Sequence, residues 1–326
     1  MKGYEFIDDK GTFKLEDPDL YSYLYFPVGS SSGMMGSLTP ESGGDLKTSQ
    51  NTFILEPVSS DNLHNNRSTR NFWLCFEDGS LVSATGASAL AHSKRFTADK
   101  DKVTLYGGLL WQSVVRDIAD KEIRTEVTTF VPVETEDKIE LTRVKITNTG
   151  SSPVAFTPTA ATPIYGRSAD NIRDHRNVTS MLNRMTVTEY GITNDPTLTF
   201  DERGHRKNKV IYGFFAAEAD GTKPVSFCPI AEDFIGEGGA FDNPRFPATG
   251  TPASKPGDRA DGFEAMGAAM FEKKALAPGE SAEYVFALAI NDMLKPSDNE
   301  TDIETESDRI QDMASKYLSG NVFESE

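Results

Sequence analysis

The sequence has little cysteine, little histidine and no long apolar run. Its 326 residues include only 2 cysteines, Cys75 and Cys228, which lie far apart in strand-like sequence, so a disulfide framework is not expected. No segment approaches the roughly 18 consecutive apolar residues that a membrane-spanning helix requires. The N-terminal stretch lacks the apolar core of a secretory signal. These absences predict a cytoplasmic chain with no membrane partner.

Basic charge is also in deficit. The chain has 33 Lys and Arg residues against 50 Asp and Glu residues, which gives a formal net charge of -17 at pH 7. A field of this sign repels phosphate backbones, so a nucleic-acid partner is not expected. The sequence has no phosphate-binding glycine motif, no Cys-x-x-Cys or His-x-x-x-His pair and no Gly-x-Ser-x-Gly elbow. We therefore expect no cofactor and no metal ion.

Apolar residues recur mainly with the period of a β-strand. Residues 122–133 alternate, with Ile123, Val127 and Val131 on one face, and the pair Asp78-Gly79 between two apolar runs is typical of a hairpin turn. Many such runs are separated by turn residues, and no alternation of strands with helices is visible. The pattern predicts an all-β fold, a large antiparallel β-supersandwich.

The predicted sandwich occupies residues 1–300, and a short helix begins the final segment, 301–326. In that helix Ile310, Ala314 and other apolar residues share one face, which must pack on the sandwich or on a partner. Residues 243–262 are rich in Pro, Gly and charge without periodicity, so we interpret them as a long surface insertion.

Three polar loops carry most of the candidate binding groups. The richest, Tyr165–Ser180, concentrates Arg, Asp, Asn and His side chains, and planar bidentate groups of this kind suit sugar hydroxyls or an oxyanion. Residues 59–71 and 200–208 also place histidine beside arginine. Such loops can converge at one end of a sandwich, or each can be a solvated segment held by its own Arg–Asp pairs. The histidines concerned are His64, His175 and His205.

Four long segments carry a family resemblance: LYSYLYFP, GGDLKTSQNTFILEPVSSDNLHNNRSTRNFW, FTPTAATPIYGRSADNIRDHRNVTSM and TLTFDERGHRKN. They resemble the N-terminal region of the glycoside hydrolase family 94 phosphorylases, especially the 1,2-β-oligoglucan and cellobiose-phosphorylase-like groups. The resemblance spans about residues 2–318 apart from 243–262. It implies a galactose-mutarotase-like supersandwich that is followed in the family by a helical linker, an (α/α)6 catalytic barrel and a small β domain.

The resemblance also implies inverting phosphorolysis, in which a barrel aspartate protonates the glycosidic oxygen while inorganic phosphate attacks the anomeric carbon. The chain ends near the start of the family's linker helices, so we expect a separately encoded barrel chain to supply catalysis. The terminal helix would then be the first linker helix, with its apolar face meant for another subunit or domain.

In this arrangement the sandwich itself is non-catalytic. It packs on the barrel, contributes to a homodimer and lends loops to a cleft for β-glucooligosaccharide and phosphate. The residues expected to bind substrate are Tyr165, Arg167, Asp170, Asn171, Arg173, Asp174, His175, Arg176, Asn66, Arg67, Arg70, Arg203 and His205.

Two other functions remain open from the sequence. One is a stand-alone carbohydrate-binding module without chemistry. The other is a mutarotase-like sugar epimerase, in which His175 or His205 acts with Glu202 as acid and base.

Overall fold

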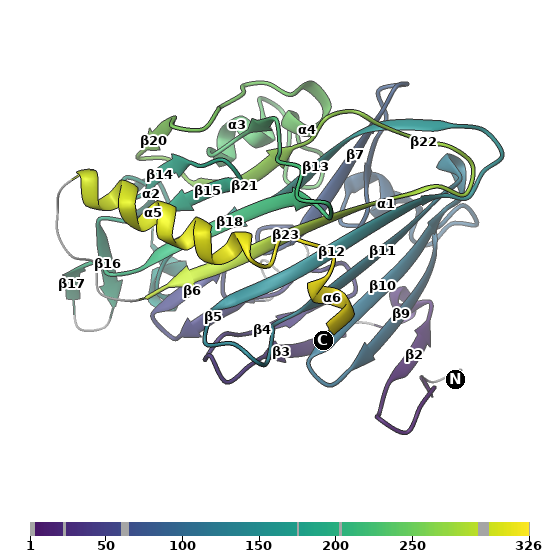
Figure 1. Cartoon of the computed structure of the whole chain (residues 1–326), viewed down its shortest axis with the longest axis horizontal. Helices are drawn as coiled ribbons and strands as arrows, with labels where there is room; N and C mark the ends of the chain where they lie inside the picture. The colour runs from purple at the N-terminus through teal and green to yellow at the C-terminus, as the bar shows by residue number, and fades with distance from the viewer. Residues whose placement is uncertain are drawn as a thin grey trace.

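The structure is a computed structural model that describes residues 4–21, 24–59, 65–174, 176–201, 204–292 and 300–325. Antiparallel strands dominate it (Figure 1). An 11-stranded sheet runs in the order β1-β2-β9-β10-β11-β12-β23-β18-β15-β14-β20, and a 6-stranded sheet in the order β19-β21-β13-β7-β8, with β22 paired to β13. A 4-stranded sheet, β3-β4-β5-β6, and the β16-β17 hairpin complete the fold. The predicted all-β supersandwich is confirmed.

The 11-stranded sheet comprises β1 (Glu5–Phe6), β2 (Phe13–Glu16), β9 (Lys102–Gly108), β10 (Trp111–Ile118), β11 (Ile123–Phe130), β12 (Ile139–Asn148), β14 (Arg184–Val187), β15 (Gly191–Asn194), β18 (Ile211–Glu218), β20 (Arg259–Asp261) and β23 (Ser281–Asn291). The 6-stranded sheet comprises β7 (Asn71–Phe76), β8 (Leu81–Ser83), β13 (Val154–Ile164), β19 (Ser226–Phe227), β21 (Ala265–Met270) and β22 (Lys274–Leu276). The remaining strands are β3 (Phe26–Gly29), β4 (Met35–Leu38), β5 (Leu46–Ser49), β6 (Thr52–Leu55), β16 (Leu198–Asp201) and β17 (Gly204–Lys207).

The helices are short apart from one. They are α1 (Ala89–Lys94), α2 (Arg176–Ser180), α3 (Ala231–Ile235), α4 (Phe246–Thr249), α5 (Glu300–Ser315) and α6 (Val322–Ser325), with 3-10 turns η1 (Pro18–Leu20), η2 (Ala119–Lys121) and η3 (Ala169–Arg173). No helix among the described residues is long and apolar enough to cross a membrane.

The main core lies between the two large sheets. Leu74 of β7, Ala269 of β21 and Phe286 of β23 are buried together in it. In β11 the alternation predicted from the sequence is confirmed, because Ile123 and Val127 are buried. In such a strand, burial of one face fixes the register, since a shift by one residue would expose every inward side chain.

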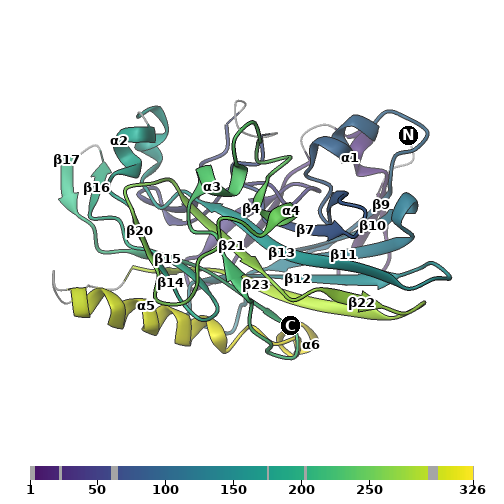
Figure 2. The same ribbon diagram turned by 90° about the horizontal axis from the view of Figure 1, so that it is seen from above.

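Helix α5 lies across the outer face of the 11-stranded sheet (Figure 2). Ile310, Ala314 and Leu318 are buried there with Phe215 of β18 and Val285 of β23. The expectation that this apolar face is meant for another subunit or domain is wrong. The face covers the chain's own sheet, which otherwise would expose apolar side chains on that side.

Residues 243–262 lie at the surface, as predicted, and most of them are exposed, but the segment contains a short helix, α4, and an edge strand, β20. Phe246 of α4 is 0% exposed and packs against Phe234 of α3, with ring centroids 6.4 Å apart. Further along, β20 pairs with β14 at the edge of the large sheet. A single aromatic anchor and a three-residue edge strand order this segment, and neither produces a periodic signal in the sequence.

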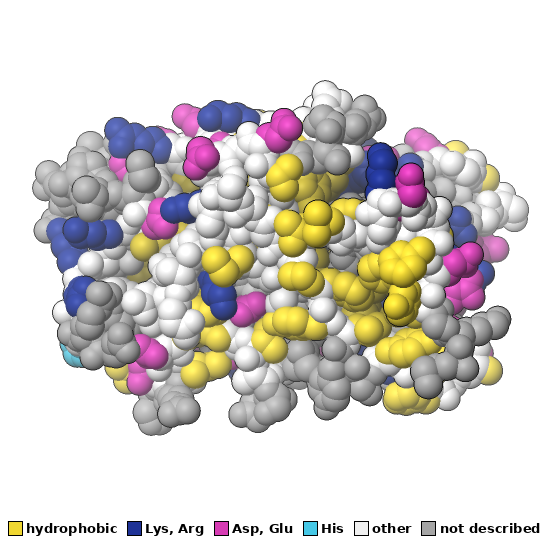
Figure 3. Space-filling model, turned by 90° about the horizontal axis from the view of Figure 1, so that it is seen from below, with side chains coloured by type: hydrophobic (Ala, Val, Ile, Leu, Met, Phe, Trp, Pro, Cys, Tyr) yellow, Lys and Arg dark blue, Asp and Glu magenta, His cyan; other side chains and the backbone are white. Residues whose placement is uncertain are grey.

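The lower face of the molecule gathers apolar side chains on its surface (Figure 3). Tyr25 precedes β3, Met35 lies in β4 and Leu109 lies in the turn between β9 and β10, and these side chains are 44%, 45% and 84% exposed. An apolar surface of this kind often marks an interaction site.

Candidate functional site

The segment that begins the polar loop Tyr165–Ser180 is held rigidly. Beyond β13 the backbone pairs with β6, because Tyr165 N donates to Ile54 O at 2.7 Å and Phe53 N donates to Arg167 O at 3.0 Å. The Tyr165 hydroxyl donates to Ser168 O at 3.0 Å. Burial raises the pKa of Tyr212, whose ring lies beneath Gly166, so this phenol stays neutral.

Arg167 ties the loop to the sheet beside it. Its guanidinium donates to Thr179 Oγ1 at 2.6 Å and to Glu264 Oε1 at 2.7 Å, and it lies 5.2 Å from the centre of the Tyr165 ring. The side chain is only 6% exposed. Arg167 therefore joins both ends of the loop to the residue that precedes β21, which is a structural role.

The middle of the loop is more open. In η3, Asn171 Nδ2 donates to Asp174 Oδ2 at 2.8 Å, while Asp170 and Asp174 are exposed. Residues 173 and 176 are described by their backbone alone, and His175 lies outside the described residues.

The third polar loop is a β-hairpin rather than irregular structure. Strands β16 and β17 pair Phe200 with His205, and His205 is exposed. This hairpin packs beside η3, so two of the three predicted loops are neighbours. His64, Glu202 and Arg203 lie outside the described residues, so a convergence of all three histidines stays a prediction.

Two other predicted residues serve the fold in this structure. Asn66 has a φ of 60° and donates from Nδ2 to Ala87 O at 2.8 Å. Arg70 is 0% exposed, and its guanidinium is bound in two places by Glu140 of β12. A contact between Arg70 and a sugar would require this pair to open.

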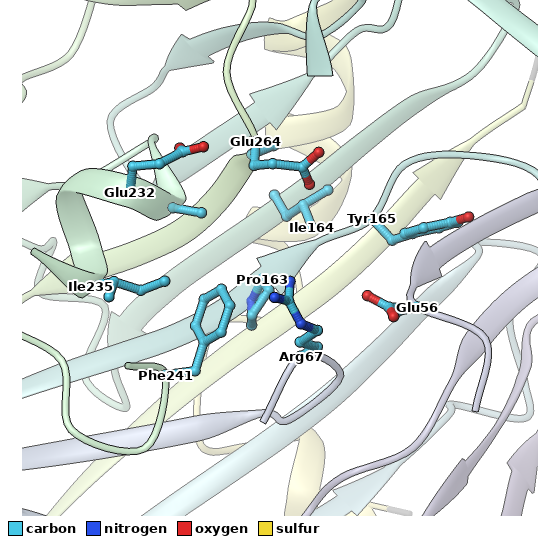
Figure 4. A pocket seen from close by; sticks show the side chains of 11 residues that line it. Glu56, Arg67, Pro163, Ile164, Tyr165, Glu232, Ile235, Phe241 and Glu264 are labelled. Atoms are coloured by element: carbon cyan, nitrogen blue, oxygen red, sulfur yellow. The ribbon is translucent and has the colours of Figure 1, made fainter. Parts of the chain in front are cut away.

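A cavity of about 220 Å³ opens between α3, the end of β13 and the start of β21 (Figure 4). Two of the predicted substrate-binding residues, Arg67 and Tyr165, line it. The other lining residues are Glu56, Pro163, Ile164, Ala231, Glu232, Ile235, Phe241, Glu264 and Ala265. They come from segments far apart in the chain, and none stands in a recognisable motif, so sequence reasoning missed the four among them that are charged or aromatic.

The cavity combines an apolar floor with charged walls. Pro163 and Ile164 lie at its base, and the Arg67 guanidinium stands 5.6 Å from the centre of the Phe241 ring (Figure 4). Glu264 is held by an ion pair with Arg167, which does not itself line the cavity. Within the part of the chain that the structure describes, no group of three His, Cys, Asp or Glu side chains could hold a metal ion. The arrangement can bind a small polar molecule.

Comparison with known proteins gives a family for most of the chain. Residues 114–319 match the family described as glycosyl hydrolase 94, supersandwich domain. A search of curated proteins finds no match.

Several solved structures are similar to this fold at low identity. A bacterial glucoamylase complexed with acarbose is 11% identical, with a TM-score of 0.46, over 90% of this chain and 36% of that one. A putative kojibiose phosphorylase from human microbiome is 8% identical, with a TM-score of 0.44, over 96% and 36%. A putative aldose 1-epimerase from Escherichia coli K12 is 10% identical, with a TM-score of 0.44, over 82% and 99%. The chain thus spans 36% of the length of the glucoamylase and of the phosphorylase.

Proposed function

Because the chain belongs to the glycosyl hydrolase 94 supersandwich family, we propose that it is the non-catalytic sandwich subunit of an inverting β-glucan phosphorylase. The substrates of the complete enzyme are a β-1,2-glucooligosaccharide and inorganic phosphate. A separately encoded (α/α)6-barrel chain completes it. The observation that carries the proposal is the family match, which covers residues 114–319.

The division of labour follows from the chemistry. A carboxylic acid of the barrel gives its proton to the glycosidic oxygen while a phosphate oxygen forms a bond to the anomeric carbon. The products are α-glucose 1-phosphate and a glucan one residue shorter. The sandwich contributes orientation of the substrate and exclusion of water, which lower the barrier without any proton transfer by this chain.

The loop Tyr165–Ser180 is the part of the sandwich that we assign to the substrate cleft. Its base is fixed by Arg167 and by backbone pairing with β6, whereas Asp170 and Asp174 are exposed. Loops that carry function on a rigid base are common in enzymes, because the base holds the tip in position at low entropic cost. The neighbouring β16-β17 hairpin, with the exposed His205, extends the same wall.

The apolar lower face is the surface that we assign to assembly with the barrel. Tyr25, Met35 and Leu109 are among the exposed large apolar side chains of the structure, and covering such side chains removes apolar area from water. A homodimer is a further expectation from the resemblance, and the same face is available to it.

The proposal is tested by reconstitution. The chain is purified alone and with a barrel chain of the family, and release of glucose 1-phosphate from β-1,2-glucooligosaccharides is followed with and without phosphate. We expect phosphate-dependent release from the complex and none from either chain alone. A pure complex that cleaves no β-glucoside with phosphate would overturn the proposal.

A second function is favoured by one observation, the cavity beside Arg67 and Tyr165. A stand-alone carbohydrate-binding module would bind sugar without any barrel chain. Calorimetric titration of the chain alone with β-glucans separates the two functions, because the phosphorylase subunit needs no affinity of its own for a long glucan.

A further inference from the structure

The size of the cavity limits what it can hold. Its volume of about 220 Å³ is below the roughly 300–1,000 Å³ of sites that enclose drug-sized ligands. A space of this size encloses about one six-membered ring, and a longer saccharide would extend beyond it.

The lining of the cavity suits both the apolar C–H face and the hydroxyl groups of such a ring. Pro163, Ile164 and Ala265 supply an apolar floor suited to the C–H face of a pyranose. Arg67 supplies several donors, and Glu56 and Glu264 supply carboxylate acceptors. A carboxylate has about four acceptor positions, so each can accept from more than one donor.

The charges favour a neutral ligand. Glu56, Glu232 and Glu264 would repel a phosphate or a carboxylate. A cationic ligand would be repelled by the guanidinium of Arg67. This guanidinium already lies over the Phe241 ring, so the ring face is not available for a second cation. A molecule with many hydroxyls and no charge avoids both costs.

The walls are fixed before any ligand arrives. Glu264 is held by Arg167 at 2.7 Å, and the Tyr165 hydroxyl is bound to the Ser168 carbonyl. Arg67 lies on the Phe241 ring. Side chains held in this way lose little conformational entropy when a ligand binds.

We propose that this cavity binds a single neutral sugar ring, and that it does so in the sandwich alone. The site lies in the chain's own fold, between α3, β13 and β21, and needs no residue of the barrel. It rests on the second function proposed above, for which it names the site and the ligand class, and it can succeed or fail independently of the phosphorylase function.

The test uses methyl β-D-glucopyranoside as the probe and the purified chain without a barrel. Saturation-transfer NMR and calorimetry measure binding to the parent chain and to Arg67→Ala. We expect binding by the parent chain and a loss of affinity of at least about tenfold in the variant, because Arg67 provides charged hydrogen bonds. Arg143→Ala is the matched control, since Arg143 makes the same kind of contact with Phe323, 5.1 Å from the ring centre.

A second variant tests the site in case Arg67→Ala does not fold. Ala231→Leu keeps every charged group and fills the space between α3 and the floor, so we expect it also to abolish binding while thermal unfolding stays cooperative. Inorganic phosphate and methylammonium are titrated in parallel. The proposal is overturned if the parent chain does not bind the glucoside, if both cavity variants bind it as well as Arg143→Ala does, or if either ion binds in its place.

Discussion

The Arg70 guanidinium and the Glu140 carboxylate form a bidentate pair that is closed off from solvent. Arg70 Nε lies 2.7 Å from Glu140 Oε1 and Arg70 Nη2 lies 2.8 Å from Glu140 Oε2, and the side chains are 0% and 1% exposed. Arg70 Nη1 also donates to Gly44 O at 2.7 Å. The pair thus joins the start of β7, strand β12 of the 11-stranded sheet and the segment before β5.

Breaking this pair should destabilise the fold strongly. Arg70→Met leaves Glu140 buried without a partner, and we expect the free energy of unfolding to fall by about 3–5 kcal/mol. Urea denaturation measures it. The double variant Arg70→Met with Glu140→Leu should regain much of the loss, because it removes the uncompensated charge. Lys223→Met is the control: its pair with Glu189 is exposed, and its loss should cost less than about 1 kcal/mol. If Arg70→Met keeps full stability, the pair is not structural.

The Glu41 carboxylate should make stability depend on pH in the acid range. Burial raises the pKa of Glu41, but hydrogen bonding to His92 and the charges of His92, Arg95 and Arg116 outweigh it, so the pKa is lowered from its usual 4.5. A lowered folded pKa gives stability that is present above the unfolded value and is lost as the pH falls through the folded value.

We therefore expect Glu41→Gln to be less stable than the parent chain at pH 7, by about 1 kcal/mol. The gap should begin to shrink as the pH falls below about 4.5, where the unfolded chain takes up the proton, and it should close once the pH is below the lowered pKa of the folded chain. Urea denaturation at several pH values measures it. Glu77→Gln, whose side chain is 67% exposed, serves as the control. A gap that is constant from pH 7 to pH 3 would contradict the assignment.

Helix α5 should behave as part of the sandwich. Ile310 is 1% exposed against β18 and β23, so Ile310→Ala should lower the free energy of unfolding by about 2–5 kcal/mol. Asp308→Ala, on the exposed side of the same helix, should change it by less than about 0.5 kcal/mol. Equal effects of the two substitutions, or separate unfolding of the helix by limited proteolysis, would show that α5 is not docked.

Local patterns were enough to predict strands such as β11, but not the β16-β17 hairpin, strand β20 or the partners of the side chains. The alternation of Ile123 and Val127 is visible within one strand, because burial follows a period of two. Helix α5 was placed correctly in the sequence, since its apolar residues recur with a helical period. The surface that α5 covers could not be predicted, because either the chain's own sheet or a partner could bury the same apolar face of the helix.

The candidate site was predictable only in part for a related reason. Arg67 and Tyr165 stand out in the sequence because charge and aromatic residues cluster around them. Glu264 lies in the segment RADGFEAMGA, which carries no recognisable motif, and its pairing with Arg167 joins positions 97 residues apart. Composition also could not separate Arg67, which lines the cavity, from Arg70, which is fully buried three residues later.

The loop Tyr165–Ser180 gives the sharpest test of the phosphorylase proposal. In the complex with a barrel chain, we expect Arg173→Ala and His175→Ala each to lower kcat/KM for phosphorolysis by about 10–100-fold, the cost of one lost hydrogen bond to a charged group.

The sandwich should stay folded in both variants, since the described ties of the loop are made by Arg167 and by the backbone. Arg124→Ala is the control, because Arg124 lies on β11 and pairs with Asp117 at the surface. Loss of folding in either loop variant would show that the charged side chains of the loop stabilise the fold through ion pairs and do not bind substrate. Unchanged activity in both would remove the loop from the cleft, so that any sugar contact of this chain would have to be made elsewhere, for example in the cavity beside Arg67.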